Sequence, residues 1–493
     1  MIGEHLPALQ VVVPLVAAPL IVLLRSAPLA WLLAVGVSWA SLVIAVALLL
    51  QVQSGGVISY AIGSWPPPWG IEYRVDALNA YVLVLVGLVA SVVAPYARSS
   101  VAAELPRERH YLFYCMYMLC LAGLLGIAIT GDAFNLFVFL EISSLSTYVL
   151  IALGRNRRAL LAAYQYLIMG TIGATFYVIG IGLLYLMTGT LNLADMASRL
   201  REVHELRPVL AALAFITVGV SLKLALFPLH FWLPNAYACA PSPVTAFLAA
   251  TATKVSVYVL LRFYFSVFGA AFVFERLPMR GLVLTLSVLA AVTASFVAVF
   301  QQDLKRMFAY SSVAQIGYIT LGIALVNENG LAGAVVHLFN HGVTKAALFL
   351  LVGGIALRTG QVTFERVAGL GRRMPLTSLG IVIAGLSLIG TPGTAGFISK
   401  WYLVLGALDR GEWWLAALIV ASSLIAVAYV WRFVEAAYLR EPAPGVAGSG
   451  EAPDGMLVPA WLMVAACVYF GLDTSYSLGG ARAAVAVLLG GAP

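Results

Sequence analysis

The chain has 493 residues, of which 62% are apolar and only 10% are charged, and its mean hydropathy is +0.98. A soluble domain would carry about 25% charged residues, so this composition excludes an ordinary soluble protein. The net charge of +7 fits a membrane protein with basic cytoplasmic loops and does not indicate nucleic-acid binding.

Apolar runs long enough to cross a ~30 Å hydrocarbon core as helices recur along the whole chain. A β-barrel would instead show alternating segments of about ten residues. We therefore predict an all-α polytopic membrane protein with about 14 transmembrane helices in the lipid bilayer. In chain order, the helices are expected at residues 8–24, 28–50, 75–96, 111–130, 133–153, 160–187, 208–230, 243–269, 280–300, 306–325, 330–357, 375–406, 413–439 and 456–472.

The loops on the two sides of this predicted bundle differ in basic charge. One side has 14 basic residues and the other has 8. The positive-inside rule therefore places the first side in the cytoplasm and both termini outside, in a bacterial or archaeal cell (inner) membrane. The larger set is Arg25, Arg98, Arg107, Arg109, Arg155, Arg157, Arg158, Lys305, Arg306, Arg358, Arg366, Arg372, Arg373 and Arg440.

Lysine is rare in this chain but is concentrated in the predicted spans. The chain has 23 arginines and five lysines, and four of the lysines lie inside spans: Lys223, Lys254, Lys345 and Lys400. A charged side chain in mid-bilayer costs about 2.5–3.5 kcal/mol on insertion scales. A buried lysine can lose and regain a proton, whereas arginine stays charged. Lysines inside the spans and arginines outside them therefore predict a proton relay. The alternative is that the lysine side chains snorkel to the membrane interface or form structural pairs.

Glu141 and two histidines add to this pattern. Glu141 is the only carboxylate well inside an apolar run, and a buried lysine on another helix is its expected partner. His337, His341 and Lys345 are spaced four residues apart, which places them on one helix face where histidine can transfer protons. Haem ligation fits poorly because residues one turn apart cannot take opposite axial positions. A structural hydrogen-bonded stripe is the remaining alternative.

Two predicted spans contain breaks. Prolines at 228, 234, 241 and 243 follow Lys223, and Pro392 precedes Lys400 among three glycines. Proline inside a span removes a backbone hydrogen bond and exposes carbonyls. Broken helices in corresponding parts of two halves are typical of inverted repeats with a polar site between them.

We therefore predict four segments in the chain. Residues 1–109 form three N-terminal helices, and residues 441–493 form a polar linker and a C-terminal helix. Residues 110–270 and 280–440 form two inverted repeats, each with one proton site. The four cysteines have no CxxC or Cys/His spacing, so the sequence indicates neither a disulfide framework nor a metal site.

Three runs of the sequence resemble a known family. They are GDAFNLFVFLEISSLSTYVLIAL, SLKLALFPLHFWLPNAYACAPSPVTAFLAATATKVSVYVL and QQDLKRMFAYSSVAQIGYI. They are similar to the antiporter-like subunits of respiratory NADH:quinone oxidoreductase and of Mrp-type multisubunit cation/proton antiporters. The resemblance covers about residues 70–440. The GD-FNLFVF-E segment and the length look most like the D-type subunit of the Mrp antiporter.

This resemblance implies 14 helices with two inverted five-helix repeats and broken seventh and twelfth helices. It implies that Glu141 and Lys223 form an ion pair that gates protonation and that Lys254 is the central lysine. His337, His341 and Lys345 match the polar stripe of the eleventh helix, and Lys400 matches the lysine that faces the exit. The family also implies other membrane subunits as partners and no redox cofactor in this chain.

The expected function is that of a proton-translocating subunit of a sodium/proton antiporter, a secondary transporter that is not itself an enzyme. A sodium site normally gathers several oxygen ligands, so one deep carboxylate suggests that Na⁺ passes through a partner subunit. The alternative is a pumping subunit of a redox-driven complex, of the NADH:quinone oxidoreductase or membrane-bound hydrogenase type. An inert scaffold fits poorly with four buried lysines.

Overall fold

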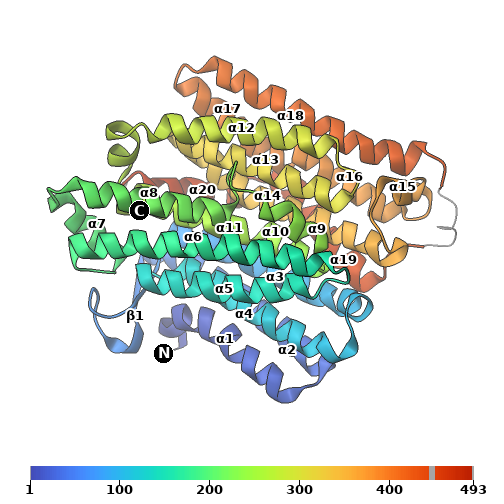
Figure 1. Cartoon of the computed structure of the whole chain (residues 1–493), viewed down its shortest axis with the longest axis horizontal. Coiled ribbons are helices and arrows are strands. Elements are labelled where there is room, and N and C mark those ends of the chain that lie inside the picture. The colour runs from blue at the N-terminus through green and yellow to red at the C-terminus, as the bar shows by residue number, and fades with distance from the viewer. Residues whose placement is uncertain (1, 443–449, 491–493) are drawn as a thin grey trace.

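The computed structural model describes residues 2–442 and 450–490. Long helices run side by side from one end of the molecule to the other (Figure 1). Both termini lie at one end, which we call the termini end. The short helix α15 (Phe364–Val367) lies at the opposite end, which we call the α15 end.

Among the described residues, thirteen helical segments are long and apolar enough to cross a membrane. The number becomes fourteen if the pair Phe364–Arg372 and Pro375–Ile389, bent by 109°, counts as one span, so the prediction of about 14 helices is confirmed. The spanning helices are α1 (Leu6–Leu24), α2 (Ala27–Gly55), α3 (Ala77–Glu104), α4 (His110–Ile129), α5 (Ala133–Ala152), α6 (Arg158–Thr188), α8 (Leu206–Leu224), α10 with α11 (Ser242–Ala250 and Ala252–Leu261), α12 (Met279–Val299), α13 (Leu304–Leu325), α14 (Glu328–Thr359), α18 (Trp413–Val434) and α19 (Asp454–Leu472).

Several short elements were not predicted from the sequence, among them two strands and two helices. Strands β1 (Ile58–Ala61) and β2 (Glu72–Val75) form an antiparallel hairpin at the termini end, and α7 (Leu193–Arg199) lies at the same end. Helix α20 (Ser475–Leu488) follows α19. With 4 to 14 residues, these elements are too short for the pattern of a transmembrane helix.

Two of the isolated β-bridges among the described residues show how the two repeats are related. Asp132 pairs with Asn192 and Asp303 pairs with Thr363, so each bridge joins residues 60 positions apart. Each aspartate caps a helix, α5 or α13, by accepting a backbone N–H three residues further on, at 2.6 and 2.9 Å. The first bridge adjoins α7 at the termini end, and the second adjoins α15 at the opposite end (Figure 1). The same motif at opposite ends agrees with inverted repeats, whose exact boundaries stay a prediction.

Both predicted helix breaks are present. Helix α8 ends at Leu224, and the chain turns through residues 225–231 before α9 (Trp232–Cys239) begins. Helices α16 (Pro375–Ile389) and α17 (Ala395–Asp409), of 15 residues each, replace the span expected at 375–406. Gly390 has φ +89° at this second break, a left-handed conformation that favours glycine.

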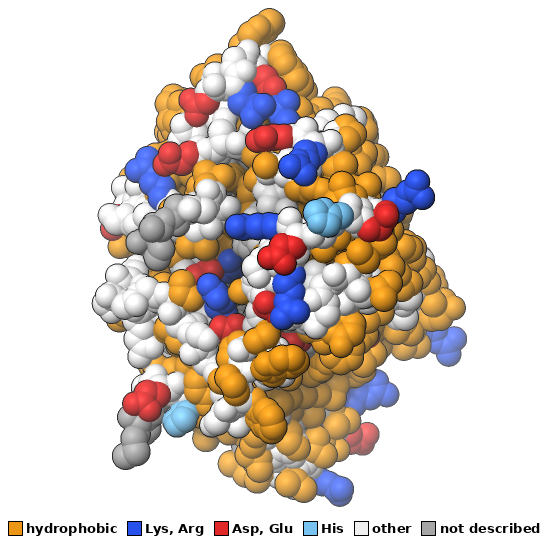
Figure 2. Space-filling view, turned by 90° about the vertical axis from the view of Figure 1, so that its left-hand side faces the viewer, with side chains coloured by type: hydrophobic (Ala, Val, Ile, Leu, Met, Phe, Trp, Pro, Cys, Tyr) orange, Lys and Arg blue, Asp and Glu red, His pale blue; other side chains and the backbone are white. Residues whose placement is uncertain are grey.

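The most deeply buried helix carries the polar stripe. Every residue from Gly330 to Ile355 of α14 is buried. By contrast, outer helices such as α1, α2 and α6 expose many leucine, valine and isoleucine side chains. Figure 2 shows charged and polar side chains gathered over the termini end, with hydrophobic side chains along the flank. This distribution fits a bundle that exposes apolar flanks to lipid and polar ends to water.

The predicted linker between residues 440 and 454 is only partly described, because residues 443–449 lie outside the described residues. Glu451, at the end of this segment, caps α16. Its carboxylate accepts hydrogen bonds from Leu376 N and Thr377 Oγ1, both at 2.6 Å. The end of the predicted linker is therefore held at the start of α16.

Candidate proton path

Glu141 on α5 and Lys223 on α8 face each other. Lys223 Nζ lies 3.6 Å from Glu141 Oε1 and donates a hydrogen bond to Ser144 Oγ at 2.6 Å. The residue pattern left the partner of Glu141 open, and the family resemblance implied Lys223. The structure brings these two residues together.

Glu141 is less buried than the sequence suggested. Its side chain is 27% exposed, whereas that of Lys223 is 5% exposed. It lies in the middle of an exposed apolar stripe on α5, formed by Phe134, Val138, Leu145 and Val149, which are 40–54% exposed. A carboxylate on such a face, within a transmembrane helix, is costly in lipid.

Lys254 lies just after the break between α10 and α11 and is fully buried. Its ammonium donates hydrogen bonds to the carbonyl of Ala249 at 2.5 Å and to Thr253 Oγ1 at 3.3 Å. Both acceptors are neutral. A helix break leaves backbone carbonyls without their usual partners, and here one of them holds the ammonium.

The stripe on α14 places two imidazole rings and an ammonium one turn apart. The rings of His337 and His341 stack with centroids 5.7 Å apart and planes 4° from parallel. One turn further on, Lys345 donates to the carbonyl of Phe308 at 2.7 Å and to Ser311 Oγ at 2.5 Å. The predicted stripe is thus a continuous buried column.

Lys400 on α17 reaches back across the second helix break. Its ammonium donates to the carbonyls of Leu388 and Ile389 at 3.3 and 2.8 Å, and to Ser423 Oγ at 3.0 Å. These carbonyls end α16, where the helix dipole is negative. The ring of Tyr318 lies 4.8 Å from the ammonium and adds a cation–π contact. The break therefore supplies the polar groups that hold Lys400.

The central residues form one electrostatic cluster. Lys254, Lys345 and Lys400 are all close enough to His341 for their charges to interact with it. A gap too narrow for a water molecule lies beside the first pair, and Lys223 and Ser256 are among the residues that line it.

Sequence reasoning was wrong about two basic residues. Lys305 was assigned to a loop, but it is only 6% exposed and donates to the carbonyl of Ala240 at 3.1 Å. Arginine was expected only outside the spans, but Arg262 is 8% exposed and lies 2.5 Å from Asp76. The position of Arg262 inside the expected span 243–269 could have indicated that it is buried. No feature of the sequence indicated that Lys305 is buried, because it follows a polar Gln-Gln-Asp run.

Within residues 2–442 and 450–490, no three His, Cys, Asp or Glu side chains form a group that could hold a metal ion. The side chains of this site can transfer protons between amines, imidazoles and a carboxylate. Fold and site together define a multi-pass α-helical membrane protein with buried titratable side chains in its core.

Known proteins share this architecture. The family described as "NADH:quinone oxidoreductase/Mrp antiporter, TM" matches residues 130–426. The N-type subunit of NADH-quinone oxidoreductase from Desulforudis audaxviator is 44% identical over 95% of this chain and 96% of its own length. The D-type subunit of the Na(+)/H(+) antiporter from Alkalihalophilus pseudofirmus is 31% identical over 78% of this chain and 76% of its own length. A chain in the structure of the Mrp complex from Dietzia sp. superposes with a TM-score of 0.89 at 26% sequence identity. The superposition covers 99% of this chain and 98% of that one.

This chain therefore belongs to the family of antiporter-like membrane subunits that NADH:quinone oxidoreductase and the Mrp antiporter share. The family resemblance inferred from the sequence is confirmed.

Proposed function

We propose that this chain transfers protons through the membrane as one subunit of a multisubunit complex. The observation that carries the proposal is the way the buried lysines are held. Among the described residues only Lys223 pairs with a carboxylate, whereas Lys254, Lys345 and Lys400 are held by carbonyls and hydroxyls. Neutral acceptors suit both the charged and the neutral amine, as a relay needs. A purely structural ammonium would favour a buried ionic partner.

The exposed face of α5 supports a role within a larger assembly. Glu141 lies on this face among apolar side chains. A neighbouring membrane subunit that covers the stripe would take the carboxylate out of contact with lipid.

The first candidate for the driving process is exchange with a monovalent cation such as Na⁺. The antiporter relative from Alkalihalophilus pseudofirmus and the superposition on the Mrp complex support it. On this proposal the cation passes through a partner subunit, because Glu141 is the only carboxylate in the proposed path.

A second candidate is a redox-driven pump. The relative from NADH-quinone oxidoreductase has the higher identity of the two, 44% against 31%, and it covers more of this chain. The same lysines and histidines would serve both processes, so the difference lies in the partner subunits.

The deciding experiment is purification of the complex from its native membrane with identification of the co-purifying proteins. Small hydrophobic subunits without flavin or iron–sulfur centres favour the antiporter, whereas subunits with such centres favour the redox pump. Proton transport in vesicles that contain the purified complex tests the proposal common to both. Transport unaffected by loss of the charges of Glu141 and Lys223 would refute it.

A further inference from the structure

A second buried charge cluster lies at the termini end, outside the path described above. Arg262, where α11 continues into a π-helical turn, pairs with Asp76, the N-cap of α3, at 2.5 Å. The Arg262 guanidinium also hydrogen-bonds Asn79 Oδ1, and its Nε donates to Tyr258 Oη at 3.2 Å. Tyr258 in turn accepts from Asn79 Nδ2 at 2.7 Å. Four side chains from two helices are thus tied into one network.

Two members of this network lie on the same helix as the central lysine or on its continuation. Lys254, Tyr258 and Arg262 are spaced four residues apart, so they follow one face of α11 and its continuation. Arg262 is about 12 Å further along the helix than Lys254, at ~1.5 Å per residue. The ammonium of Lys254 turns the other way, toward the carbonyl of Ala249.

A cavity of about 300 Å³ begins at the network. Asp76, Asn79, Tyr258 and Arg262 line it together with Arg74 and Arg201. The lining therefore contains three arginines and one aspartate. The excess of positive charge opposes entry of a cation or a hydrated proton.

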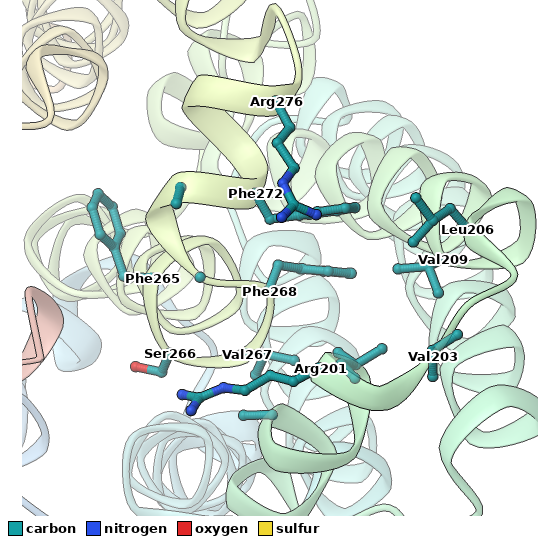
Figure 3. Close-up of a pocket in the computed structure, with 14 residues that line it drawn as sticks. Arg201, Val203, Leu206, Val209, Phe265, Ser266, Val267, Phe268, Phe272 and Arg276 are labelled. Carbon is teal, nitrogen blue, oxygen red and sulfur yellow. The ribbon is translucent and has the colours of Figure 1, made fainter.

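Arg201 connects this cavity with a second one. The second cavity, of about 350 Å³, also borders the π-helical segment, and Phe268 and Phe272 line it together with Arg201 and Arg276. Figure 3 shows the stem of Arg201 passing below Val267, with its guanidinium on the side of Ser266. Arg201 and Ser266 line both cavities, so the Arg201 charge contributes to the first cavity as well.

We propose that the Arg262–Asp76 network is an electrostatic seal that prevents Lys254 from exchanging protons with the cavity at the termini end. The proposal rests on the proposed function, since a seal is needed only if Lys254 carries protons. A guanidinium stays charged under all physiological conditions, and Asp76, Asn79 and Tyr258 hold it across the face of α11 that leads from Lys254 to this cavity. Protons would otherwise leave the path before reaching the second repeat.

The test is passive proton leak through membrane vesicles that contain the assembled complex. A pH difference is imposed without any driving reaction, and its decay is followed with an internal pH dye. Arg262→Gln is expected to speed the decay by about tenfold, because a unit charge is removed from the barrier. Arg262→Lys keeps the positive charge, so its leak rate is expected to equal that of the unsubstituted complex. Arg280→Gln is the matched control, since it removes the Arg280–Glu412 ion pair away from this cavity.

The route of the leak is tested with a double variant. If the seal protects Lys254, the leak of Arg262→Gln disappears in Arg262→Gln/Lys254→Met. Three results would overturn the proposal. They are a proton leak that persists in the double variant, an equally fast leak in Arg280→Gln, and a leak in Arg262→Gln no faster than in the unsubstituted complex. If Arg262→Gln does not assemble, Arg201→Gln is tested instead, and its rate of proton leak is expected to rise about twofold. An unchanged leak rate in Arg201→Gln would then overturn the proposed seal.

The leak assay separates the two proposals. A tight Arg262→Gln complex together with abolished driven transport in Glu141→Gln refutes the seal and leaves the proposed function intact. Unchanged driven transport in both Glu141→Gln and Lys223→Gln refutes the proposed function whatever the leak.

Discussion

His337 and His341 stack almost parallel in the core of the bundle, but only one of the two rings is held by hydrogen bonds. The nitrogens of His337 contact Ser399 Oγ at 2.7 Å and Gln315 Oε1 at 2.8 Å. Among the described residues, neither nitrogen of His341 has a hydrogen-bond partner. His337 is therefore fixed in position, whereas His341 has both nitrogens available for proton exchange.

This difference predicts separable effects of substitution. His337→Leu leaves the side-chain carbonyl of Gln315 without this partner and should lower the free energy of unfolding by about 1–3 kcal/mol, whereas Ser399 keeps its hydrogen bond to the carbonyl of Gly396. His341→Leu should leave thermal stability nearly unchanged and reduce proton transport at least about tenfold. Thermal unfolding of the purified complex and transport in vesicles measure the two effects. Equal loss of stability in both variants would contradict the assignment.

The Glu141–Lys223 pair should be essential for transport. Glu141→Gln keeps the shape of the side chain and removes its charge, so driven proton transport should fall at least about tenfold while the complex still assembles. Glu435→Gln is the control, because Glu435 pairs with Arg440 at 3.0 Å near a helix end. Wild-type rates in Glu141→Gln would refute the role of Glu141.

Lys400 should tolerate neither loss of charge nor a permanent charge. Both Lys400→Met and Lys400→Arg should abolish transport, the first because no proton is bound and the second because guanidinium does not release one. Ser423→Ala removes one of three acceptors and should retain most activity. Vesicle transport assays with matched protein levels distinguish these cases. Normal transport by Lys400→Arg would show that Lys400 only supplies charge.

Close packing of α6 on α8 should be needed to hold Lys223 in place. A Cβ atom on Gly173 would lie 2.9 Å from the carbonyl oxygen of Gly219, so Gly173→Val forces the two helices apart. We expect a loss of about 1–3 kcal/mol in stability and weaker transport. Gly182→Val, on the same helix, meets nothing within 4 Å and should be neutral. Comparable thermal stability of the two variants would count against this packing.

The predicted orientation can be tested by labelling. Trp69, 85% exposed at the termini end, and the exposed Gln361, next to α15, lie at opposite ends of the bundle. An impermeant maleimide should label Trp69→Cys in intact cells and Gln361→Cys only after permeabilisation. The unsubstituted chain shows the background from Cys239, which is less buried than the other three cysteines. The reverse pattern would invert the topology.

The fold could be predicted from the sequence because each span is a long apolar run, and prolines and glycines mark the two predicted breaks. The break between α10 and α11, at Thr251, has neither residue type and was not predicted. Pro228 and Pro392 both lie within the breaks that the structure shows. The hairpin and α20 could not be found in this way. Their stability comes from contacts with distant segments, such as the hydrogen bond from Tyr81 Oη to the carbonyl of Ser477 at 2.9 Å.

The candidate site was predictable only in its residue types. A lysine in an apolar run is visible without a structure, but its partners are not. Asp76 and Arg262 are 186 positions apart, and Asp76 begins a helix, where an aspartate is ordinary. The acceptors of Lys254 and Lys400 are mostly backbone carbonyls, which no side-chain pattern reveals.

The paired bridges at Asp132 and Asp303 have a geometric consequence. Inverted repeats are related by an axis that lies in the plane of the membrane, so equivalent positions sit at equal depths on opposite sides of the mid-plane. On the proposed function, each repeat then has to conduct across only about 15 Å of a ~30 Å hydrocarbon core. Either repeat alone would open to one compartment, and a complete crossing would need both repeats of the chain.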